Sequence, residues 1–408
     1  MSESYEFNFV GKKRAALEAQ KKIQATLQPI INQSRDFDTT ENLYIEGDNL
    51  NALKLLQESY RGKVKCIYID PPYNTKGDFI YRNDFTHSDW CAMIYSRLLV
   101  AKNFLTDDGA IFISIDDREQ ANLRKICDEV FGEKNFIANI IWKRKVHGNN
   151  MGFIPPVHDF IVVYCKDINF LKPFALPQAE ETLKKKYSNP DNDPRGAWTT
   201  MSLTASHKGP YFAIVNPKTG EKFFPPPGRY WVFNEAEVLR RIADGRIIFG
   251  KRGTSKPVQK VFAAERNLTS KPTAWFDKQG SNSDATKELL KIFGRKIFVS
   301  PKPVTLIEYI LKFATDKNSI VMDFFSGSAT TAHAVMKLNA SDGGQRKFIM
   351  IQIAEATPEN SEARRAGYET VCEIGKERIR RVGDKLKAAY PNLDTGFKVF
   401  KVETFTNH

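Results

Sequence analysis

The sequence predicts an α/β protein with a mostly parallel sheet, on the basis of three observations. Near-continuous apolar runs occupy residues 64–69, 109–115, 319–322 and 348–353, which is typical of strands buried on both faces. Segments with helical apolar spacing lie between these runs. Hydrophobic residues make up 41% of the 408 residues, which is enough for a packed core. At about 100–200 residues per domain, this length predicts two or three folded units.

The expected helices complete the alternating pattern. They lie at residues 49–60, 303–314, 332–337 and 361–388, and the last of them is amphipathic and rich in charge. Three of the expected strands end in aspartate, namely Asp70, Asp116 and Asp323. Ligands of open α/β sheets bind at the carboxyl ends of the strands, so these three side chains are placed for chemistry.

The composition argues against a secreted or membrane protein. No window approaches 18 consecutive apolar residues, and the first residues contain no apolar leader segment. The five cysteines stand far apart without a C-x-x-C pair. This spacing argues against a disulfide framework and a zinc knuckle, and it fits a reducing cytoplasm. No cluster of histidine, cysteine and carboxylate residues indicates a metal site.

The positive charge of the chain is concentrated in one segment. The chain has 61 Lys and Arg against 48 Asp and Glu, a balance of +13. Residues 142–295 hold 26 of the basic and 14 of the acidic residues, a balance of +12. Large aromatic residues alternate with the basic ones there: Trp142, Trp198, Tyr211, Tyr230, Trp231, Trp275 and Phe276. Any single one of these aromatic residues is more often part of the core, and the basic clusters 143–145 and 184–186 alone would usually be solvated surface. The asymmetry of the whole segment nevertheless indicates nucleic acid.

This segment divides the chain into three parts. We expect residues 1–141 and 296–408 to be the two halves of the domain that contains the sheet. Residues 142–295 would be a basic domain inserted between them. The candidate contacts to DNA phosphates are Lys143, Arg144, Lys145 and Arg252.

The sharpest chemical signal is the tetrapeptide Asp70-Pro71-Pro72-Tyr73, directly after the strand expected at 64–69. The two prolines have no N–H and hold a stiff, extended turn, so the Asp70 carboxylate and the Pro71 carbonyl form two adjacent acceptors. An exocyclic amino group has two N–H donors to match them, and Tyr73 offers a flat face for a ring. The tetrapeptide alone is also an ordinary turn, but its position at a strand end favours a clamp for an aromatic amine such as adenine.

The second signal is the run of small residues at 323–331, which leads from a strand into a helix. Gly327 permits close approach of the backbone, and the free N–H groups at a helix start attract an anion. The lysine of a P-loop is missing from this run. Such a loop is weak evidence alone, and it becomes strong in combination with the Asp-Pro-Pro-Tyr turn.

Together, these motifs resemble the amino-group DNA methyltransferases that use S-adenosyl-L-methionine. The order of catalytic motif, target-reading region and cofactor loop is similar to that of the β class. It implies a circularly permuted Rossmann-like methyltransferase fold with an inserted target-recognition domain. Further stretches resemble the modification subunit of type III restriction-modification systems, which methylates adenine N6: residues 9–13, 43–50, 70–75, 78–81, 87–90 and 135–142. The resemblance covers roughly residues 1–145 and 296–402, and it does not extend through the basic middle.

The resemblance implies a pocket for S-adenosyl-L-methionine. Its lining would include Asp323, Phe325, Gly327, Ser328 and Thr330, and Lys302 would belong to the motif that closes the methionine side. Asp48 would meet the cofactor adenine, or it would cap the helix at 49–60. Many relatives have a ribose-binding acid at the position of Gln352, so either Gln352 or Glu355 would hold the ribose.

The chain departs from the family pattern at Ala329, where many relatives have a second glycine. A positive φ angle at Ala329 would be strained, because an alanine side chain disfavours the left-handed region.

The implied activity is methyl transfer to N6 of an adenine flipped out of double-stranded DNA, with Asp70, Pro71, Pro72 and Tyr73 as catalytic residues. Transfer to cytosine N4 uses the same geometry, and an aspartate before Pro-Pro-Tyr only favours adenine. An RNA or protein-amide methyltransferase is disfavoured, and a DNA-recognition subunit that has lost catalysis is the alternative from a different class. The candidate partners are double-stranded DNA, a second copy of the chain and a restriction (nuclease and helicase) subunit, in a bacterial cytoplasm and without a membrane.

Overall fold

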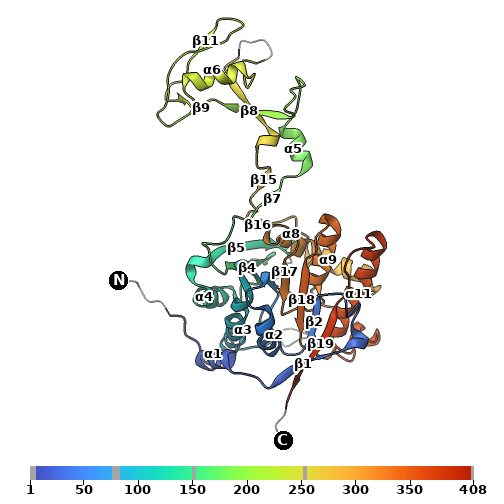
Figure 1. Ribbon diagram of the computed structural model, residues 1–408. Helices are drawn as coiled ribbons and strands as arrows, with labels where there is room; N and C mark the ends of the chain where they lie inside the picture. The colour runs from blue at the N-terminus through green and yellow to red at the C-terminus, as the bar shows by residue number, and fades with distance from the viewer. Residues whose placement is uncertain (1–5, 76–82, 149–152, 251–254, 406–408) are drawn as a thin grey trace. The chain divides into compact units, whose positions relative to one another are not determined.

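A computed structural model describes residues 6–75, 83–148, 153–250 and 255–405. The chain divides into two compact units, one made of residues 1–174 and 272–408 and the other of residues 175–271 (Figure 1). The inserted unit is therefore shorter than the expected 142–295. The reason is that residues at both ends of that segment add strands to the main sheet of the first unit.

A ten-stranded sheet runs through the first unit in the order β1-β19-β2-β18-β17-β3-β4-β6-β5-β16. The strands are β1 Ala25–Pro29, β2 Leu43–Glu46, β3 Val64–Ile69, β4 Leu105–Ile115, β5 Phe136–Lys143, β6 His158–Cys165, β16 Trp275–Phe276, β17 Ile320–Asp323, β18 Lys347–Gln352 and β19 Lys398–Thr404. All neighbours from β19 to β4 are parallel, whereas β1 and β6 pair antiparallel. The expected mostly parallel sheet is thus confirmed.

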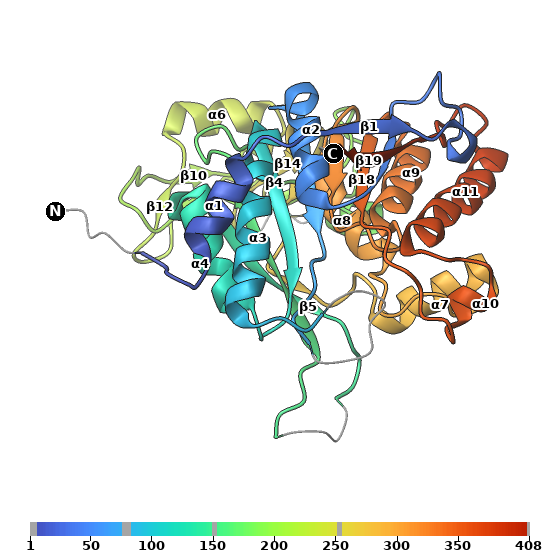
Figure 2. The same ribbon diagram turned by 90° about the horizontal axis from the view of Figure 1, so that it is seen from below.

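Helices cover both faces of this sheet, as Figures 1 and 2 show, with α1 to α4 on one face and α8, α9 and α11 on the other. The helices of the first unit are α1 Lys12–Gln20, α2 Asn49–Tyr60, α3 His87–Ala101, α4 Gln120–Phe131, α7 Asn282–Phe293, α8 Val304–Ala314, α9 Thr330–Asp342, α10 Glu362–Arg365 and α11 Val371–Ala389. Short 3-10 turns lie at Ile31–Gln33, Lys102–Phe104 and Glu133–Asn135.

One expected helix is wrong in its extent. The single helix at 361–388 is two helices, α10 and α11, separated by a turn that contains Gly367. Gly367 has a φ of +87°, a left-handed conformation that a continuous α-helix does not contain. Thr370 then starts α11 afresh as its N-cap, with its side chain accepting from the backbone N–H of Glu373.

The sheet brings the two sequence motifs together. Strands β3 and β17 are parallel neighbours, with Ile67 opposite Met322. Asp70 directly follows β3 and Asp323 ends β17, so both lie at the same carboxyl edge of the sheet. Both aspartates are thus at the edge where ligands of open α/β sheets bind.

The second unit is built from short strands around a small core. Its elements are β7 Leu176–Pro177, α5 Glu180–Lys186, β8 Trp198–Ser202, β9 Thr204–Ala205, β10 Ile214–Val215, β11 Lys222–Phe223, β12 Tyr230–Trp231, α6 Glu235–Ala243, β13 Ile247–Ile248, β14 Val258–Phe262, the 3-10 turn Ala263–Glu265 and β15 Thr269–Ser270. Its core contains Leu203, Ile214, Trp231, Val238, Ile247 and Phe249.

Within the four described ranges, no helix combines the length and the apolar character needed to cross a bilayer.

Candidate active site

The Asp-Pro-Pro-Tyr turn is held by contacts from two other elements. The indole Nε1 of Trp90, on α3, donates to the Pro72 carbonyl at 2.7 Å. The ammonium Nζ of Lys302 lies 2.6 Å from each carboxylate oxygen of Asp70. The same Nζ is 4.8 Å from the centroid of the Tyr73 ring, a cation–π contact. Lys302, expected on the methionine side of a cofactor, therefore also contacts Asp70 and Tyr73.

The residue after this turn fixes its exit. Asn74 has a φ of +58°, and asparagine tolerates this left-handed conformation better than most residues. Its Nδ2 donates at 2.6 Å to Glu119, whose side chain is fully buried, and its Oδ1 accepts from the backbone N–H of Phe85 at 2.8 Å. Glu119 also contacts Nδ1 of His87 at 2.7 Å. Sequence reasoning did not identify Glu119, which holds the side chain of Asn74 at the end of the turn.

The loop after β17 is organised by the Asp323 carboxylate. One of its oxygens accepts from the Phe325 N–H at 3.0 Å, and the other accepts from the Thr331 hydroxyl at 2.6 Å. Burial raises the pKa of Asp323 to about 7. Gly327 has a φ of +50°, and its N–H donates at 2.7 Å to Oε1 of Gln352 at the end of β18. Asp323 thus holds Phe325 and Thr331 near the two ends of the turn, and Gln352 holds Gly327 between them.

Ala329 has the positive φ angle that would be strained for an alanine. This buried residue has φ +58° and ψ +41°, in the left-handed region, and it is the N-cap of α9. The side chains on either side of it are held by Arg378 of α11, which is fully buried. Nη1 of Arg378 donates to the Ser328 hydroxyl at 2.9 Å and to the Thr330 hydroxyl at 2.7 Å. Burial lowers the pKa of Arg378 to about 10, so it stays charged at neutral pH.

All the residues expected to bind a cofactor line one cavity. They are Asp48, Lys302, Asp323, Phe325, Gly327, Ser328, Thr330, Gln352 and Glu355. Asp48 also has the capping role that was its alternative, because it accepts from the Asn51 N–H at 3.0 Å, and Arg97 contacts its other oxygen at 2.7 Å. The buried hydroxyl of Ser326, in the same lining, has no hydrogen-bond partner among the described residues.

A second cavity lies beside the first. Its lining includes Asp70, Pro71 and Tyr73 of the turn, together with Asp116, Arg144 and Asp159. Both linings contain Asp70, Ser300 and Lys302, so these residues stand where the two cavities adjoin. Pro72 lines the first cavity rather than the second.

Asp159 is an unexpected acid in the second cavity. It is the second residue of β6, and its side chain is only 5% exposed. Burial raises the pKa of Asp159 to about 6, although Lys302 and Arg144 oppose the rise. A charged residue at the start of the apolar run 160–165 was the signal in the sequence that could have identified it.

The expected DNA contacts have different surroundings. Lys143 and Lys145 line a surface hollow together with Lys278. Arg144, however, points into the second cavity, where its Nε lies 2.7 Å from Oδ1 of Asp159. Arg252 lies outside the described residues.

The aromatic residues of the basic segment divide into core and surface. Trp142, Trp231 and Phe276 are buried and belong to the core, whereas Trp198 and Tyr230 are only partly buried. Tyr211 and Trp275 are 61% and 54% exposed, so their rings are available for stacking.

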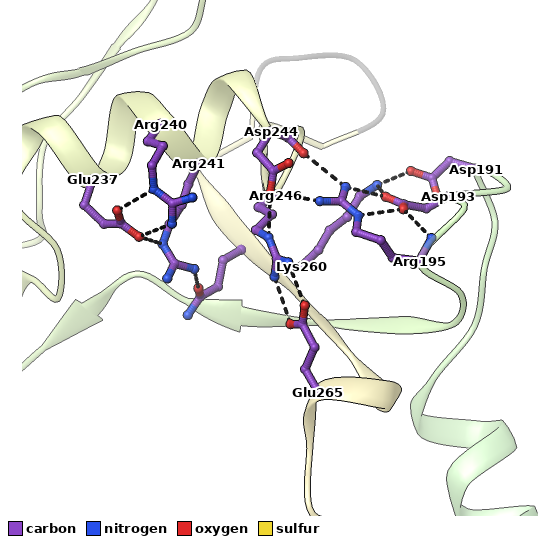
Figure 3. Close-up of polar contacts among 11 residues, drawn as sticks. Asp191, Asp193, Arg195, Glu237, Arg240, Arg241, Asp244, Arg246, Lys260 and Glu265 are labelled. Carbon is purple, nitrogen blue, oxygen red and sulfur yellow. Dashed lines mark hydrogen bonds and ion pairs between the residues drawn. The ribbon is translucent and has the colours of Figure 1, made fainter.

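The second unit keeps much of its charge in internal ion pairs. Residues 175–271 contain 17 Lys and Arg against 9 Asp and Glu, a balance of +8. Figure 3 shows the pairs, in which Asp193 and Asp244 contact Arg195 at 2.9 Å and Glu265 contacts Arg246 at 2.6 Å. Glu237 likewise contacts both Arg240 and Arg241 at 2.7 Å. The surplus charge lies instead on exposed lysines: Lys208, Lys218, Lys222, Lys256 and Lys271.

The described side chains contain no group of three or more histidine, cysteine or acidic residues that could hold a metal ion.

Arg378, which holds the loop around Ala329, could not be identified from the sequence. It is one of many charged residues in its helix, and only the fold buries it.

Comparisons with known proteins identify the family of this chain. The DNA methylase family, which comprises N6 and N4 methyltransferases, matches residues 64–362. The chain is 37% identical to the Mod subunit of the type III restriction-modification enzyme StyLTI of Salmonella typhimurium, over 100% of this chain and 67% of that protein. It is 34% identical to the EcoPI Mod subunit of Escherichia phage P1, over 100% and 74% of the two chains.

Solved structures are more distant. The M1.HpyAVI complex with S-adenosylmethionine matches 82% of this chain and 98% of its own, with a TM-score of 0.39 and 15% identity. The family match covers most of the chain and agrees with the resemblance carried by the motifs. The chain belongs to the N6/N4 DNA methylase family.

Proposed function

We propose that this chain transfers a methyl group from S-adenosyl-L-methionine to N6 of an adenine that is flipped out of double-stranded DNA. The observation that carries the proposal is the pair of adjoining cavities. One is lined by the residues expected for the cofactor, and the other by the Asp70 carboxylate and the Tyr73 ring. The order of the two motifs along the chain, on neighbouring strands, supports a circularly permuted Rossmann-like arrangement.

The first cavity fits S-adenosyl-L-methionine by its chemistry. The buried Ser326 hydroxyl has no partner among the described residues, and Lys302 supplies a cation for a carboxylate. Asp48 and Glu355 supply acceptors for amino and hydroxyl groups. Gln352 accepts from the Gly327 N–H and so also sets the shape of the loop, and Glu355 lines the same cavity as the alternative contact to the ribose. When bound, the cofactor supplies an electrophilic methyl group on a sulfonium.

In the second cavity the Asp70 turn would activate the amine. The lone pair of adenine N6 is delocalised into the ring, which makes it a poor nucleophile. Hydrogen bonds from its two N–H groups to the Asp70 carboxylate and the Pro71 carbonyl localise that lone pair and stabilise the positive charge that develops on nitrogen. Loss of one preorganised hydrogen-bonding group from the active site of an unrelated enzyme costs about 2.7–4 kcal/mol, which indicates the scale of such an effect. The amine then loses one proton, to Asp70 or to solvent, and Tyr73 stacks on the flipped base.

Adenine is the preferred target because of the aspartate in the turn and because of the relatives. The StyLTI and EcoPI proteins are Mod subunits of type III restriction-modification enzymes. By analogy we propose that this chain is the modification component of such a system and associates with a restriction subunit. The basic second unit and the hollow with Lys143 and Lys145 would hold the DNA backbone.

Analysis of the product tests this proposal. The purified chain is incubated with unmethylated bacterial DNA and S-adenosyl-L-methionine, and the digested nucleosides are measured by mass spectrometry. We expect N6-methyladenine. N4-methylcytosine would retain the mechanism and change the target, whereas the absence of both from DNA that the protein binds would identify a recognition subunit without catalysis.

A further inference from the structure

Lys302 occupies the place where the reacting amine has to bind. Its Nζ lies 2.6 Å from both oxygens of Asp70 and 4.8 Å from the centroid of the Tyr73 ring. The contact is well enclosed, since Lys302 is 9% exposed. The Lys302 ammonium group therefore contacts both the Asp70 carboxylate, which is an acceptor of the proposed clamp, and the Tyr73 ring, on which the base would stack.

The backbone around Lys302 is conformationally constrained. Lys302 stands between Pro301 and Pro303, and each proline has a fixed φ angle. Ser300 just before them has a φ of +54°, and Pro303 is the N-cap of α8. The local chain is thus constrained, and only the flexible lysine side chain has freedom to move.

A cation in this position opposes the proposed reaction. The target nitrogen becomes positively charged as it gains the methyl group, and a neighbouring ammonium repels that charge. A hydrogen-bonded lysine on Asp70 also competes with the N–H groups of the amine for the same oxygens. A productive complex therefore requires the Lys302 ammonium to leave Asp70.

The first cavity offers a destination for it. Lys302 lines both cavities, so a change of side-chain rotamer can redirect Nζ from Asp70 to the first cavity. The acids around Lys302 lie on both sides, with Asp159 in the second cavity and Asp323 in the first, and each interacts electrostatically with it. An additional carboxylate in the first cavity would shift this balance.

We propose that Lys302 is a switch that couples the two cavities. Without cofactor it pairs with Asp70 and closes the target site, and the carboxylate of bound S-adenosyl-L-methionine draws it away and opens that site. This proposal rests on the proposed function. A ligand shifts such an equilibrium only through its different affinity for the two states, and the coupling is reciprocal. Weakening the hold of Asp70 on Lys302 must therefore strengthen cofactor binding.

Calorimetry without DNA tests this prediction. Four proteins are compared, wild type, Asp70→Asn, Lys302→Met and Asp70→Asn/Lys302→Met, with sinefungin, a stable cofactor analogue that keeps the amino-acid carboxylate. We expect Asp70→Asn to lower the Kd for sinefungin by at least fivefold, a typical allosteric coupling. The double variant should bind as weakly as Lys302→Met alone, because the gain acts through Lys302.

A second ligand separates the switch from a general effect on the pocket. Methylthioadenosine keeps the adenosine and the sulfur but has no carboxylate, so its Kd should be the same for wild type and Asp70→Asn. Thermal melting shows whether each variant folds. If Lys302→Met does not fold, the affinities of wild type and Asp70→Asn for the two ligands still test the switch.

The outcomes distinguish the switch from the function on which it rests. Sinefungin binding that Asp70→Asn leaves unchanged, or an equal gain for methylthioadenosine, overturns the switch. A wild-type protein that binds neither S-adenosyl-L-methionine nor sinefungin overturns the proposed function itself.

Discussion

Arg378 donates to the Thr330 hydroxyl at 2.7 Å and thereby holds the first residue of α9 from the interior of the protein. Because it also holds Ser328, this arginine fixes both neighbours of the left-handed Ala329. A glycine would adopt this conformation without strain. We infer that Arg378 compensates for the alanine and keeps the cofactor loop in shape.

Replacing Arg378 should therefore weaken cofactor binding, and a glycine at 329 should restore it. The left-handed conformation costs an alanine about 1–2 kcal/mol, and hydrogen bonds to a charged group contribute about 1.5–3 kcal/mol. We expect Arg378→Met to raise the Kd for sinefungin roughly tenfold, which corresponds to about 1.4 kcal/mol. Ala329→Gly in the same chain should recover most of that loss, as measured by calorimetry.

The exposed Arg381 on the same helix provides the control. It contacts Glu377 and the Ile292 carbonyl rather than the loop, so Arg381→Met should leave the affinity unchanged. If Ala329→Gly gives no recovery, Arg378 does not act through the strain at Ala329.

The buried Asp159 should make stability depend on pH. Its pKa is raised from 3.8 to about 6 by burial, so between these values the unfolded chain loses the proton while the folded chain keeps it. The free energy of unfolding then falls as pH rises through this window, by up to about 3 kcal/mol. The Asp159→Asn variant cannot lose this proton, so its free energy of unfolding should not fall in this way. Urea denaturation should show that the difference in free energy of unfolding between Asp159→Asn and wild type increases from pH 4 to pH 6.5.

The exposed Asp117 gives the comparison for this pH profile. The free energy of unfolding of Asp117→Asn should differ from that of wild type by a constant amount throughout the window. A constant difference between Asp159→Asn and wild type would mean that Asp159 is ionised in the folded protein at all of these pH values.

The exposed lysines of the second unit should set the salt dependence of DNA binding. Each phosphate contact contributes about 0.9 to the slope of log K against log salt concentration. We expect the triple change of Lys208, Lys218 and Lys222 to glutamine to weaken binding and to flatten that slope by up to about 2.7. Fluorescence anisotropy with duplex DNA at several salt concentrations measures both quantities.

A matched variant in the first unit removes the same charge elsewhere. Lys13, Lys21 and Lys22 are exposed near the N-terminus, and their change to glutamine should leave the slope nearly unaltered. Equal effects of the two triple variants would show that net charge alone, rather than the second unit, governs binding.

Local sequence patterns predicted the strands of the main sheet and the residues that line the first cavity. The strands before Asp70, Asp116 and Asp323 could be predicted because buried parallel strands are continuous apolar runs. The residues of the cofactor cavity could be predicted from the resemblance, and the structure places all of them in one lining. The sequence also marked Ala329 as a position where a positive φ angle would be strained, and the structure has this angle there.

Contacts between distant segments could not be predicted in the same way. Lys302 and Asp70 are far apart in sequence, and only the fold brings the ammonium to the carboxylate. The bounds of the inserted unit were missed for a similar reason. Charge counting placed Trp142 in the basic segment, whereas it is buried and its indole bonds the Gly280 carbonyl at 2.9 Å. Counting charges also could not separate the internally paired Arg246 from the exposed Lys208.

The most direct test of the whole account is the Asp70→Ala variant, assayed for methyl transfer and for DNA binding together. Tritiated S-adenosyl-L-methionine measures transfer to DNA, and anisotropy measures the affinity for the same duplex. The account predicts that transfer falls to background while the affinity for DNA stays within a few-fold of wild type. Transfer at the wild-type rate by Asp70→Ala would contradict the proposed mechanism.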